Sequence, residues 1–332
     1  MDEGRPASNP MSNTWTVARS ASTRQHVEWV FDDGLPKLKF QDLVLKSSSR
    51  RKILYSIRNR LRQDRALVLL SKPHQGKVME VVAQSPASSH FYYNGEYTRF
   101  SDWRFIFKAR AGLLPLNGAP WKEGDKGCRR CSKADLETLA HVLNHCEGRS
   151  RCWQLRHDGI QNRVVHTAQH SAAQILSINK QVPGTNLRPD IIMKIDDVIH
   201  IIDITCPFEN RIDGFEKAKH DRYAPLLEQF ASQASRVEIN PILVGAIGAW
   251  DPANDKFLLK IASRNYLKKM QKLCISDNIR WARDIYVEHV TGRRQFDEAE
   301  ILRNPNFRPC EPVLDDPLDV PQCSTSATAM PV

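Results

Sequence analysis

The clearest indication of the fold is the segment Leu187–Tyr223, which reads LRPDIIMKIDDVIHIIDITCPFENRIDGFEKAKHDRY. It contains two apolar runs rich in β-branched residues, Ile191–Ile195 and Val198–Thr205. Only Asp196 and Asp197 separate them. Two such runs joined by two turn-forming residues predict a pair of antiparallel strands in a tight hairpin.

A single carboxylate, that of Asp203, lies inside the second apolar run. Because side chains alternate along a strand, Asp203 should share a face with Ile199 and Ile201. Burying a carboxylate in such surroundings is costly unless something binds it. The simplest partner is a divalent cation, with Asp190 at the head of the neighbouring strand as its second ligand. Magnesium takes few protein carboxylates and keeps positions for phosphate oxygens and water.

The residues after the hairpin predict a helix and then a further strand. Apolar residues recur at helical spacing between Phe215 and Phe230, and Lys219 and Tyr223 should share one face of this helix. The apolar run Val237–Ala246 predicts a buried strand. An Asp pair with a nearby lysine indicates metal-dependent phosphodiester hydrolysis, in which Lys219 offsets the developing charge.

The same stretch resembles the restriction-like nuclease core of the PD-(D/E)-x-K superfamily. Asp190, after Pro189, matches the PD element and Asp203 the second acidic position, whereas Thr205 stands where the family usually has its lysine. In the endonuclease of R-two type non-LTR retrotransposons a basic residue on the following helix replaces that lysine. Lys219, followed by Arg222-Tyr223, looks like this relocated residue.

The resemblance covers about Lys72 to Trp281 and implies further roles. The run DITCPFE is similar to D-V-T-V-P-F-E of the same family, so Glu209 would be an auxiliary acid, with Tyr223 assisting. The implied function is nicking of target DNA for insertion of the element, with catalytic Mg²⁺, structural Zn²⁺, element RNA as a second partner, and action in the nucleus after synthesis in the cytoplasm. Reverse transcription would need an upstream segment of the polyprotein, because no polymerase Asp-Asp motif occurs in a suitable context.

Composition favours a polyanionic partner. The 332 residues are 41% hydrophobic, enough for two or three domains with real cores, and carry a formal net charge of +10. Lys and Arg gathered on one surface suffice to attract phosphates. A membrane surface is the rival polyanion, but no apolar run approaches the length of a spanning helix and no apolar leader follows Met1, so we expect a soluble, non-secreted protein.

A second site is predicted by the cysteines. Of eight in the chain, three occur in the pattern C-x2-C-x9-H-x4-C, formed by Cys128, Cys131, His141 and Cys146. Thiolates and an imidazole at these spacings predict a tetrahedral structural zinc site. His145 is the alternative to Cys146 as fourth ligand, and unrelated reduced cysteines are the alternative to zinc. The segment ETLAHVLNHC resembles the knuckle that precedes the nuclease in the same retrotransposon family.

Two other helical patterns each allow a purely structural and a functional interpretation. Residues 41–72 predict a basic helix with Ile53, Ile57 and Leu61 on one face, and its arginines either face solvent or follow phosphates. The predicted helix from Phe100 to Arg110 carries Trp103 and Phe107, which, with Leu114, are expected in the core rather than as platforms for base stacking. The nucleic-acid contacts expected along the chain are Arg58, Arg62, Arg65, Arg188 and Arg222.

The expected fold class is α/β (α+β overall): a mostly helical linker region, a small zinc knuckle and a restriction-endonuclease-like core with a mixed sheet flanked by helices. The core should include Arg156-His157-Asp158, similar to an Arg-His-Asn element of the family, and end in the helices Lys256–Cys274 and Ile279–Thr291. The expected divisions are a disordered or remnant segment (1–40), a basic helical linker (41–126), the CCHC knuckle (127–148), the nuclease (150–292) and a disordered tail (293–332).

Two other functions are alternatives to the nuclease, and the sequence favours the first of them over the second. A catalytically inactive or domesticated fragment would still bind nucleic acid through the knuckle and the basic helices, and Thr205 is its best support. A zinc-dependent transcription regulator would need a helix with base-contacting polar residues, which the predicted helix 137–144 does not offer.

Overall fold

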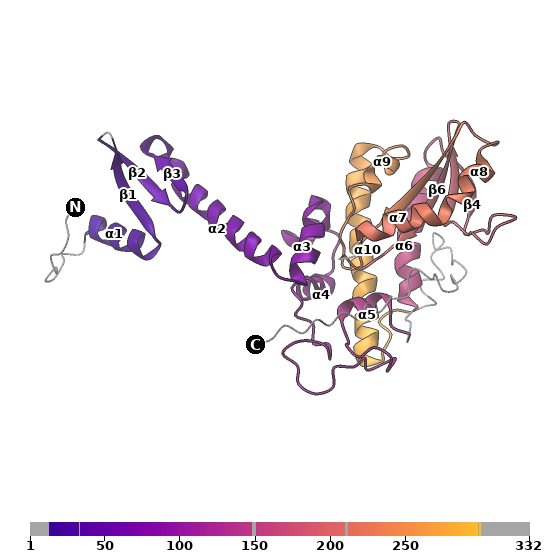
Figure 1. Cartoon of the computed structure of the whole chain (residues 1–332), viewed down its shortest axis with the longest axis horizontal. Coiled ribbons are helices and arrows are strands. Elements are labelled where there is room, and N and C mark those ends of the chain that lie inside the picture. Colours follow the sequence, from indigo (N-terminus) through magenta and orange to yellow (C-terminus); the bar gives the residue numbers. More distant parts are fainter. Residues whose placement is uncertain (1–12, 33, 148–150, 210–211, 298, 300–332) are drawn as a thin grey trace. The chain divides into compact units, whose positions relative to one another are not determined.

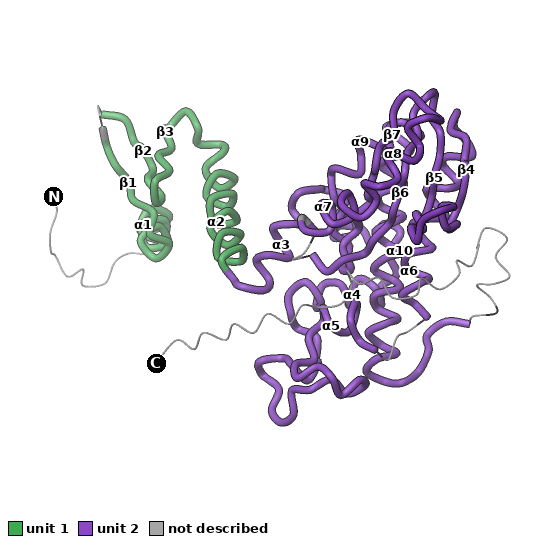
Figure 2. Tube along the Cα trace, turned by 45° about the vertical axis from the view of Figure 1, so that its right-hand side comes forward, with its two compact units in different colours: residues 1–71 green, residues 72–332 purple. Residues whose placement is uncertain are grey.

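The computed structural model describes residues 13–32, 34–147, 151–209, 212–297 and 299, and the chain forms two compact units, 1–71 and 72–332 (Figure 2). The first unit contains a three-stranded antiparallel sheet, and the second contains a four-stranded mixed sheet flanked by helices. The fold is therefore α+β, as predicted. No helix in the described ranges is both long and apolar enough to cross a membrane.

The first unit packs one helix face on a small sheet. Its apolar centre consists of Leu38, Phe40 and Leu45, against which the predicted apolar face of α2, including Ile53 and Ile57, is packed. The basic residues Arg58, Arg62 and Arg65 of α2 are exposed, so they are accessible to a charged partner. In chain order the elements are α1 (Thr14–Arg24), β1 (Val27–Asp32), β2 (Leu35–Phe40), β3 (Leu43–Lys46), the 3₁₀ helix η1 (Ser47–Lys52) and α2 (Ile53–Leu70).

Two sequence predictions for this unit are wrong. Disorder is wrong for the described part of the segment 1–40, which contains α1, β1 and β2, whereas the alternative of a remnant segment stays a prediction; residues 1–12 lie outside the described part of the chain. The predicted helix over 41–72 starts only at Ile53, because β3 and η1 precede it. The strands bury only one face, so they alternate apolar and charged residues, as in LPKLKF of β2, and resemble a polar segment in composition.

The sheet of the second unit contains the predicted hairpin. Its strands are β4 (Gln174–Ile178), β5 (Ile191–Ile195), β6 (Val198–Thr205) and β7 (Arg236–Leu243), in that spatial order. The first two pairings are antiparallel and β7 runs parallel to β6. Ile195 pairs with Val198, which leaves Asp196 and Asp197 as the turn, and Asp196 adopts a left-handed φ of 53°. Asp tolerates this backbone conformation better than most residues.

Helices cover both faces of this sheet (Figure 1). The helix α6 (Cys152–Gln169) packs against one face, where Ile202 and Ile204 point, and α10 (Arg264–Thr291) lies alongside α6. The helices α7 (Ile212–Tyr223) and α8 (Pro225–Phe230) cover the other face, where Ile199 and Ile201 point. The predicted alternation of side chains along β6 is therefore confirmed, and Asp203 lies on the α7 side.

The other helices of this unit agree only in part with the predicted ones. The sequence did not predict α3 (Gln75–Ala83) or η2 (Pro86–Tyr92). The two helices predicted as Lys256–Cys274 and Ile279–Thr291 lie mostly in the single long helix α10, which the short α9 (Asn254–Leu258) precedes. Residues 275–278, which separate the two predicted helices, continue α10, and the buried Asn278 side chain donates to the Gly245 carbonyl. The remaining elements are α4 (Phe100–Arg110) and α5 (Leu139–Asn144). The predicted tail lies outside the described residues from 300 onward.

Candidate functional site

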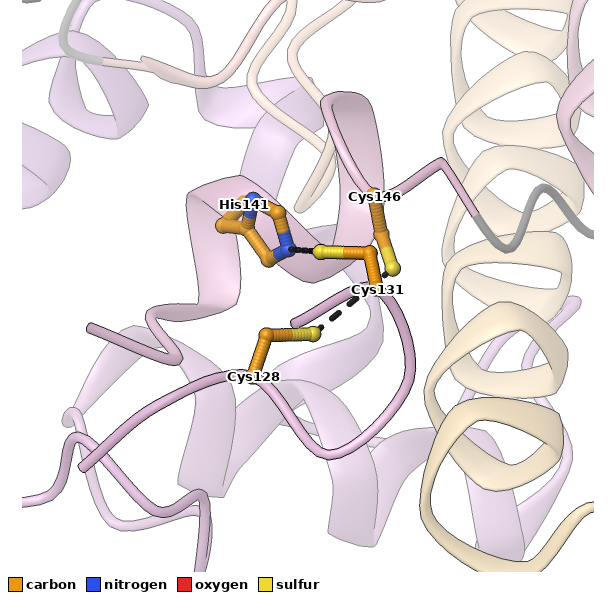
Figure 3. A group of neighbouring side chains, drawn as sticks. All are labelled: Cys128, Cys131, His141 and Cys146. Carbon is orange, nitrogen blue, oxygen red and sulfur yellow. Dashed lines mark hydrogen bonds between the residues drawn. The ribbon is translucent and has the colours of Figure 1, made fainter. Parts of the chain in front are cut away.

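The predicted zinc ligands converge at one point of the second unit (Figure 3). The ligand atoms of Cys128, Cys131, His141 and Cys146 all lie within 4.8 Å of one another. The Cys128 and Cys146 sulfurs are 3.8 Å apart, and the Cys131 sulfur is 3.4 Å from His141 Nε2. Around a zinc ion with Zn–S bonds of about 2.3 Å, tetrahedral thiolates lie about 3.8 Å apart. The cluster therefore has the size of a zinc site, and His145, the alternative ligand, is outside it.

Local hydrogen bonds place these ligands. The loop that carries the first two cysteines is closed by the Cys128 N–H, which donates to the Ala134 carbonyl at 2.9 Å. The Thr138 hydroxyl caps α5 by accepting from the His141 N–H at 3.1 Å, so this short helix begins where it can present His141. Two turns of backbone, each closed within the knuckle, thus bring together donors 18 positions apart in the sequence.

The electrostatics of the cluster suit metal ligation. Burial alone would raise the pKa of the Cys131 thiol, but backbone N–H groups of Lys133 and Ala134 outweigh it and lower that pKa. Burial, with the neighbouring His289 and His145, lowers the pKa of His141. Thiolate and neutral imidazole are the forms that bind zinc.

A buried carboxylate, that of Glu137, ties the knuckle to α10. Its Oε1 accepts from His289 Nε2 at 2.8 Å, and Arg129 forms a salt bridge with its Oε2 at 2.7 Å. Burial opposes ionisation, but Arg129 and the other donors lower the pKa of Glu137 to about 2. His289 Nε2 is also 3.9 Å from the Cys128 sulfur. No local sequence pattern indicates this contact, because His289 lies 152 positions from Glu137.

The predicted acidic site is assembled at one end of the hairpin. Ile191 pairs with Ile202, so Asp190 and Asp203 lie at the same end of β5 and β6. The Lys219 ammonium is 3.0 Å from Asp203 Oδ2. The Tyr223 hydroxyl donates to Asp203 Oδ1 at 2.5 Å. The expected shared face of α7 therefore delivers both side chains to the buried carboxylate.

His157 of α6 also belongs to this site, although the sequence did not assign it a role there. Its Nε2 is 3.0 Å from Asp190 Oδ2 and its Nδ1 is 3.2 Å from Asp158 Oδ1, so the imidazole bridges two carboxylates. The Ile204 N–H donates to the same Asp190 oxygen at 2.6 Å. The Arg156-His157-Asp158 element was the available signal, but only the fold shows that His157 contacts Asp190.

The surroundings shift the pKa values of Asp190 and Asp203 in opposite directions. Burial and the charge of Asp190 raise the pKa of Asp203, and Lys219 and Tyr223 only partly offset this. Burial disfavours ionised Asp190 as well, but His157 and the Ile204 N–H lower its pKa below the usual range. Burial and the Asp203 charge raise the pKa of Tyr223, which remains a hydrogen-bond donor. The site thus concentrates negative charge in a buried place, where a cation would relieve it.

Glu209 holds a backbone loop through one of its oxygens, and its role as an auxiliary acid stays a prediction. The side chain is fully buried, and its Oε1 accepts from the backbone N–H groups of Ile247 at 2.8 Å and Ala249 at 3.2 Å. A Cβ on Gly245 would meet the same oxygen, so this glycine lets the loop approach the carboxylate. Glu209 therefore organises the loop 245–249 through Oε1, while its buried Oε2 has no hydrogen-bond partner among the described residues.

Three other predicted residues lie near the hairpin without joining the acidic pair. Thr205 is half-buried at the end of β6, where it pairs with Leu243 of β7. Arg188 donates through Nε to the Asn179 carbonyl at 2.7 Å. The Arg222 guanidinium lies 5.5 Å from the centre of the Tyr223 ring.

The two sites differ in how many ligands they assemble. Within the described ranges, no third thiolate, imidazole or carboxylate joins Asp190 and Asp203 in a group as tight as the cysteine cluster.

No protein-family model matches the chain, and no curated protein matches it. The functional interpretation therefore depends on the geometry of these two sites.

Proposed function

We propose that this chain is a metal-dependent DNA endonuclease whose knuckle binds a structural zinc ion. The observation that carries the proposal is the convergence of Asp190, Asp203 and Lys219 at one end of a mixed sheet with helices on both faces. Two carboxylates and an ammonium group are the donor set that phosphodiester hydrolysis uses to hold a cation and a phosphate.

Each residue of the site has a role in this proposal. Asp190 and Asp203 would hold Mg²⁺, which supplies electrophilic assistance to hydrolysis when bound. Lys219 would donate to a phosphate oxygen and offset its developing charge. His157 orients Asp190 through the 3.0 Å contact, and the Tyr223 hydroxyl orients Asp203 through the 2.5 Å contact.

The charge of the chain supports a nucleic-acid substrate. The formal net charge is +10, and the arginines 58, 62 and 65 are exposed on α2. Such residues attract phosphates whatever the base sequence. In the retrotransposon setting that the sequence resembles, the partners would be target DNA and element RNA in the nucleus, with reverse transcriptase encoded upstream.

A second candidate function is binding without cleavage. Both oxygens of Asp203 have protein partners, Lys219 and Tyr223, and Thr205 stands where the superfamily usually has its lysine. Asp203, paired with Lys219 and Tyr223, is stable without a metal ion. This is expected of a fragment that binds nucleic acid without cleaving it.

A plasmid-nicking assay separates the two functions. The wild-type chain should convert supercoiled plasmid to the open circle with added magnesium and not without it. Asp203→Asn should abolish nicking and leave plasmid binding unchanged, because it removes a metal ligand rather than a phosphate anchor. Asp197→Asn, on the exposed turn of the same hairpin, is the matched control and should nick normally. Wild-type protein that binds plasmid but never nicks it would favour the second function.

The position of the lysine can be tested in the same assay. Lys219→Ala should slow nicking by about two to three orders of magnitude. Thr205 is on the strand face of Asp203, so Thr205→Lys in the Lys219→Ala background should recover part of the rate. A Lys219→Ala variant with the wild-type rate would remove Lys219 from the site.

A further inference from the structure

Three aromatic rings form a stack along one face of α4. The rings of Phe100 and Trp103 are nearly parallel, with an interplanar angle of 8° and centroids 6.1 Å apart. Those of Trp103 and Phe107 have an angle of 16° and centroids 5.7 Å apart. The spacings of three and four residues place the rings on one side of the helix. Phe100, Trp103 and Phe107 are called the aromatic stack below.

The ends of the aromatic stack face solvent. Phe100 is 72% exposed and Phe107 is 50% exposed, whereas Trp103 is partly buried against the core. The sequence prediction of a core position is therefore wrong for Phe107. The opposite side of α4, with Phe105 and Ile106, supplies the buried contacts of this helix. The two end rings, Phe100 and Phe107, are thus not needed to hold α4 in place and are accessible to a ligand.

The charges beside the aromatic stack are positive. The Arg104 guanidinium lies 6.0 Å from the centre of the Phe100 ring, and Lys108 follows Phe107; both basic residues are exposed. The acidic residue of α4, Asp102, is buried and hydrogen-bonded to Arg99 at 2.7 Å. The exposed surface of α4 therefore combines flat apolar rings with cations and carries no exposed carboxylate.

We propose that the aromatic stack binds single-stranded nucleic acid. Bases would stack on the outer faces of Phe100 and Phe107, and Arg104 and Lys108 would contact the adjoining phosphates. Aromatic side chains that alternate with basic ones are the means by which proteins bind single strands without sequence preference, because every base has a flat face. Charge complementarity favours this ligand over an apolar protein segment, which has no need of cations at its edge. The surface needs no cleavage chemistry, so it adds to the proposed nuclease function.

The test compares affinities of the zinc-loaded full chain without added magnesium. Fluorescence anisotropy measures binding of a labelled oligo(dT) and of a DNA duplex. Phe100→Leu/Phe107→Leu keeps the apolar surface and the helix but removes stacking, so oligo(dT) affinity should fall about tenfold or more. The duplex affinity and the salt dependence should not change, because no charge is removed. Phe100→Trp/Phe107→Trp should retain the affinity for oligo(dT).

Tyr93→Leu is the matched control, since Tyr93 is an aromatic residue that is 99% exposed outside the aromatic stack; it should bind oligo(dT) normally. An unchanged oligo(dT) affinity in the double leucine variant overturns the inference, as does an equal loss for oligo(dT) and duplex. Dissociation of a wild-type oligomer by the same substitutions would identify a protein contact and also overturn it. The measurement includes no cleavage step, so protein that cannot nick but shows the selective loss supports this inference independently of the nuclease.

Discussion

The zinc cluster and the acidic site balance their charge in different ways. The cluster brings the ligand atoms of three cysteines and a histidine to within 4.8 Å of one another. In the acidic site, the Lys219 ammonium already lies 3.0 Å from Asp203, and Tyr223 occupies the other oxygen. A bound cation would balance the thiolates of the cluster, whereas Lys219 already offsets part of the charge of the acidic pair. The knuckle thus has the geometry to bind an ion, and the acidic pair is partly balanced without one.

The difference predicts that removal of a zinc ligand has the largest effect in the molecule. Cys128→Ser should reduce bound zinc from one ion per chain to none and unfold the knuckle, because structural zinc supplies folding free energy directly. Elemental analysis of purified, reduced protein measures the ion, and hydrogen exchange over residues 127–147 measures the unfolding.

Cys274→Ala is the control, because Cys274 is a buried cysteine of α10 outside the cluster. This variant should keep one zinc ion. Wild-type protein that contains no zinc would contradict the prediction and remove the contrast between the two sites.

The second prediction concerns the ion pair of the acidic site. Lys219 and Asp203 are each about 5% exposed, so Lys219→Met leaves a buried carboxylate without its cation. Loss of one partner of such a pair costs about 3–5 kcal/mol of unfolding free energy. Urea denaturation measures this, with Lys217→Met as the control on the exposed side of α7.

The double variant Asp203→Asn/Lys219→Met sharpens the test. The amide oxygen can still accept from Tyr223, and no charge remains to be balanced, so most of the lost stability should return. If the double variant is as unstable as Lys219→Met, the lysine contributes by packing and the acidic site is not balanced by this pair.

The same contrast explains how much the sequence could predict. Cys128, Cys131, His141 and Cys146 lie within one short segment, so their spacing nearly determines their geometry. The hairpin, its alternating faces and the Lys219–Tyr223 face of α7 also follow from local periodicity. His157 meets Asp190 across 33 positions and His289 meets Glu137 across 152, and no local pattern encodes such contacts. The motif match that singled out Glu209 likewise does not show that its carboxylate accepts from a backbone loop.

The third prediction concerns the pH dependence of stability caused by Glu209, a buried acid outside the acidic site. Burial raises the pKa of Glu209 to about 7 from an ordinary value of 4.5. Between these pH values the folded chain holds a proton that the unfolded chain has released. The unfolding free energy should therefore fall as the pH rises from about 4.5 to 7, by about 3 kcal/mol, and level off above.

Glu209→Gln should remove this pH dependence, because Gln keeps the oxygen that accepts from Ile247 and Ala249 but cannot ionise. Denaturation at pH 5 and at pH 8 measures the difference between variant and wild type, and Glu228→Gln on the exposed surface of α8 is the control. Parallel pH profiles for Glu209→Gln and wild type would show that Glu209 is ionised throughout this range.

The smallest effect is expected where α10 supports the zinc cluster from outside. His289 donates to Glu137 at 2.8 Å and lies 3.9 Å from the Cys128 sulfur, so it positions the knuckle without being one of the four clustered ligands. His289→Ala leaves Arg129 bound to Glu137, and the knuckle should still fold with zinc. Loss of such outer contacts lowers metal affinity by about 10–100-fold.

Competition with a chromogenic chelator measures this affinity, and His166→Ala on the exposed side of α6 is the control. An unchanged affinity in His289→Ala would show that the knuckle is self-sufficient and that α10 only lies beside it. Complete loss of zinc would instead make His289 part of the primary site, with Cys128 and Glu137 as its partners in the second group that their ligand atoms form. The intermediate result is the one that fits a cluster completed by its own segment and tuned by a distant helix.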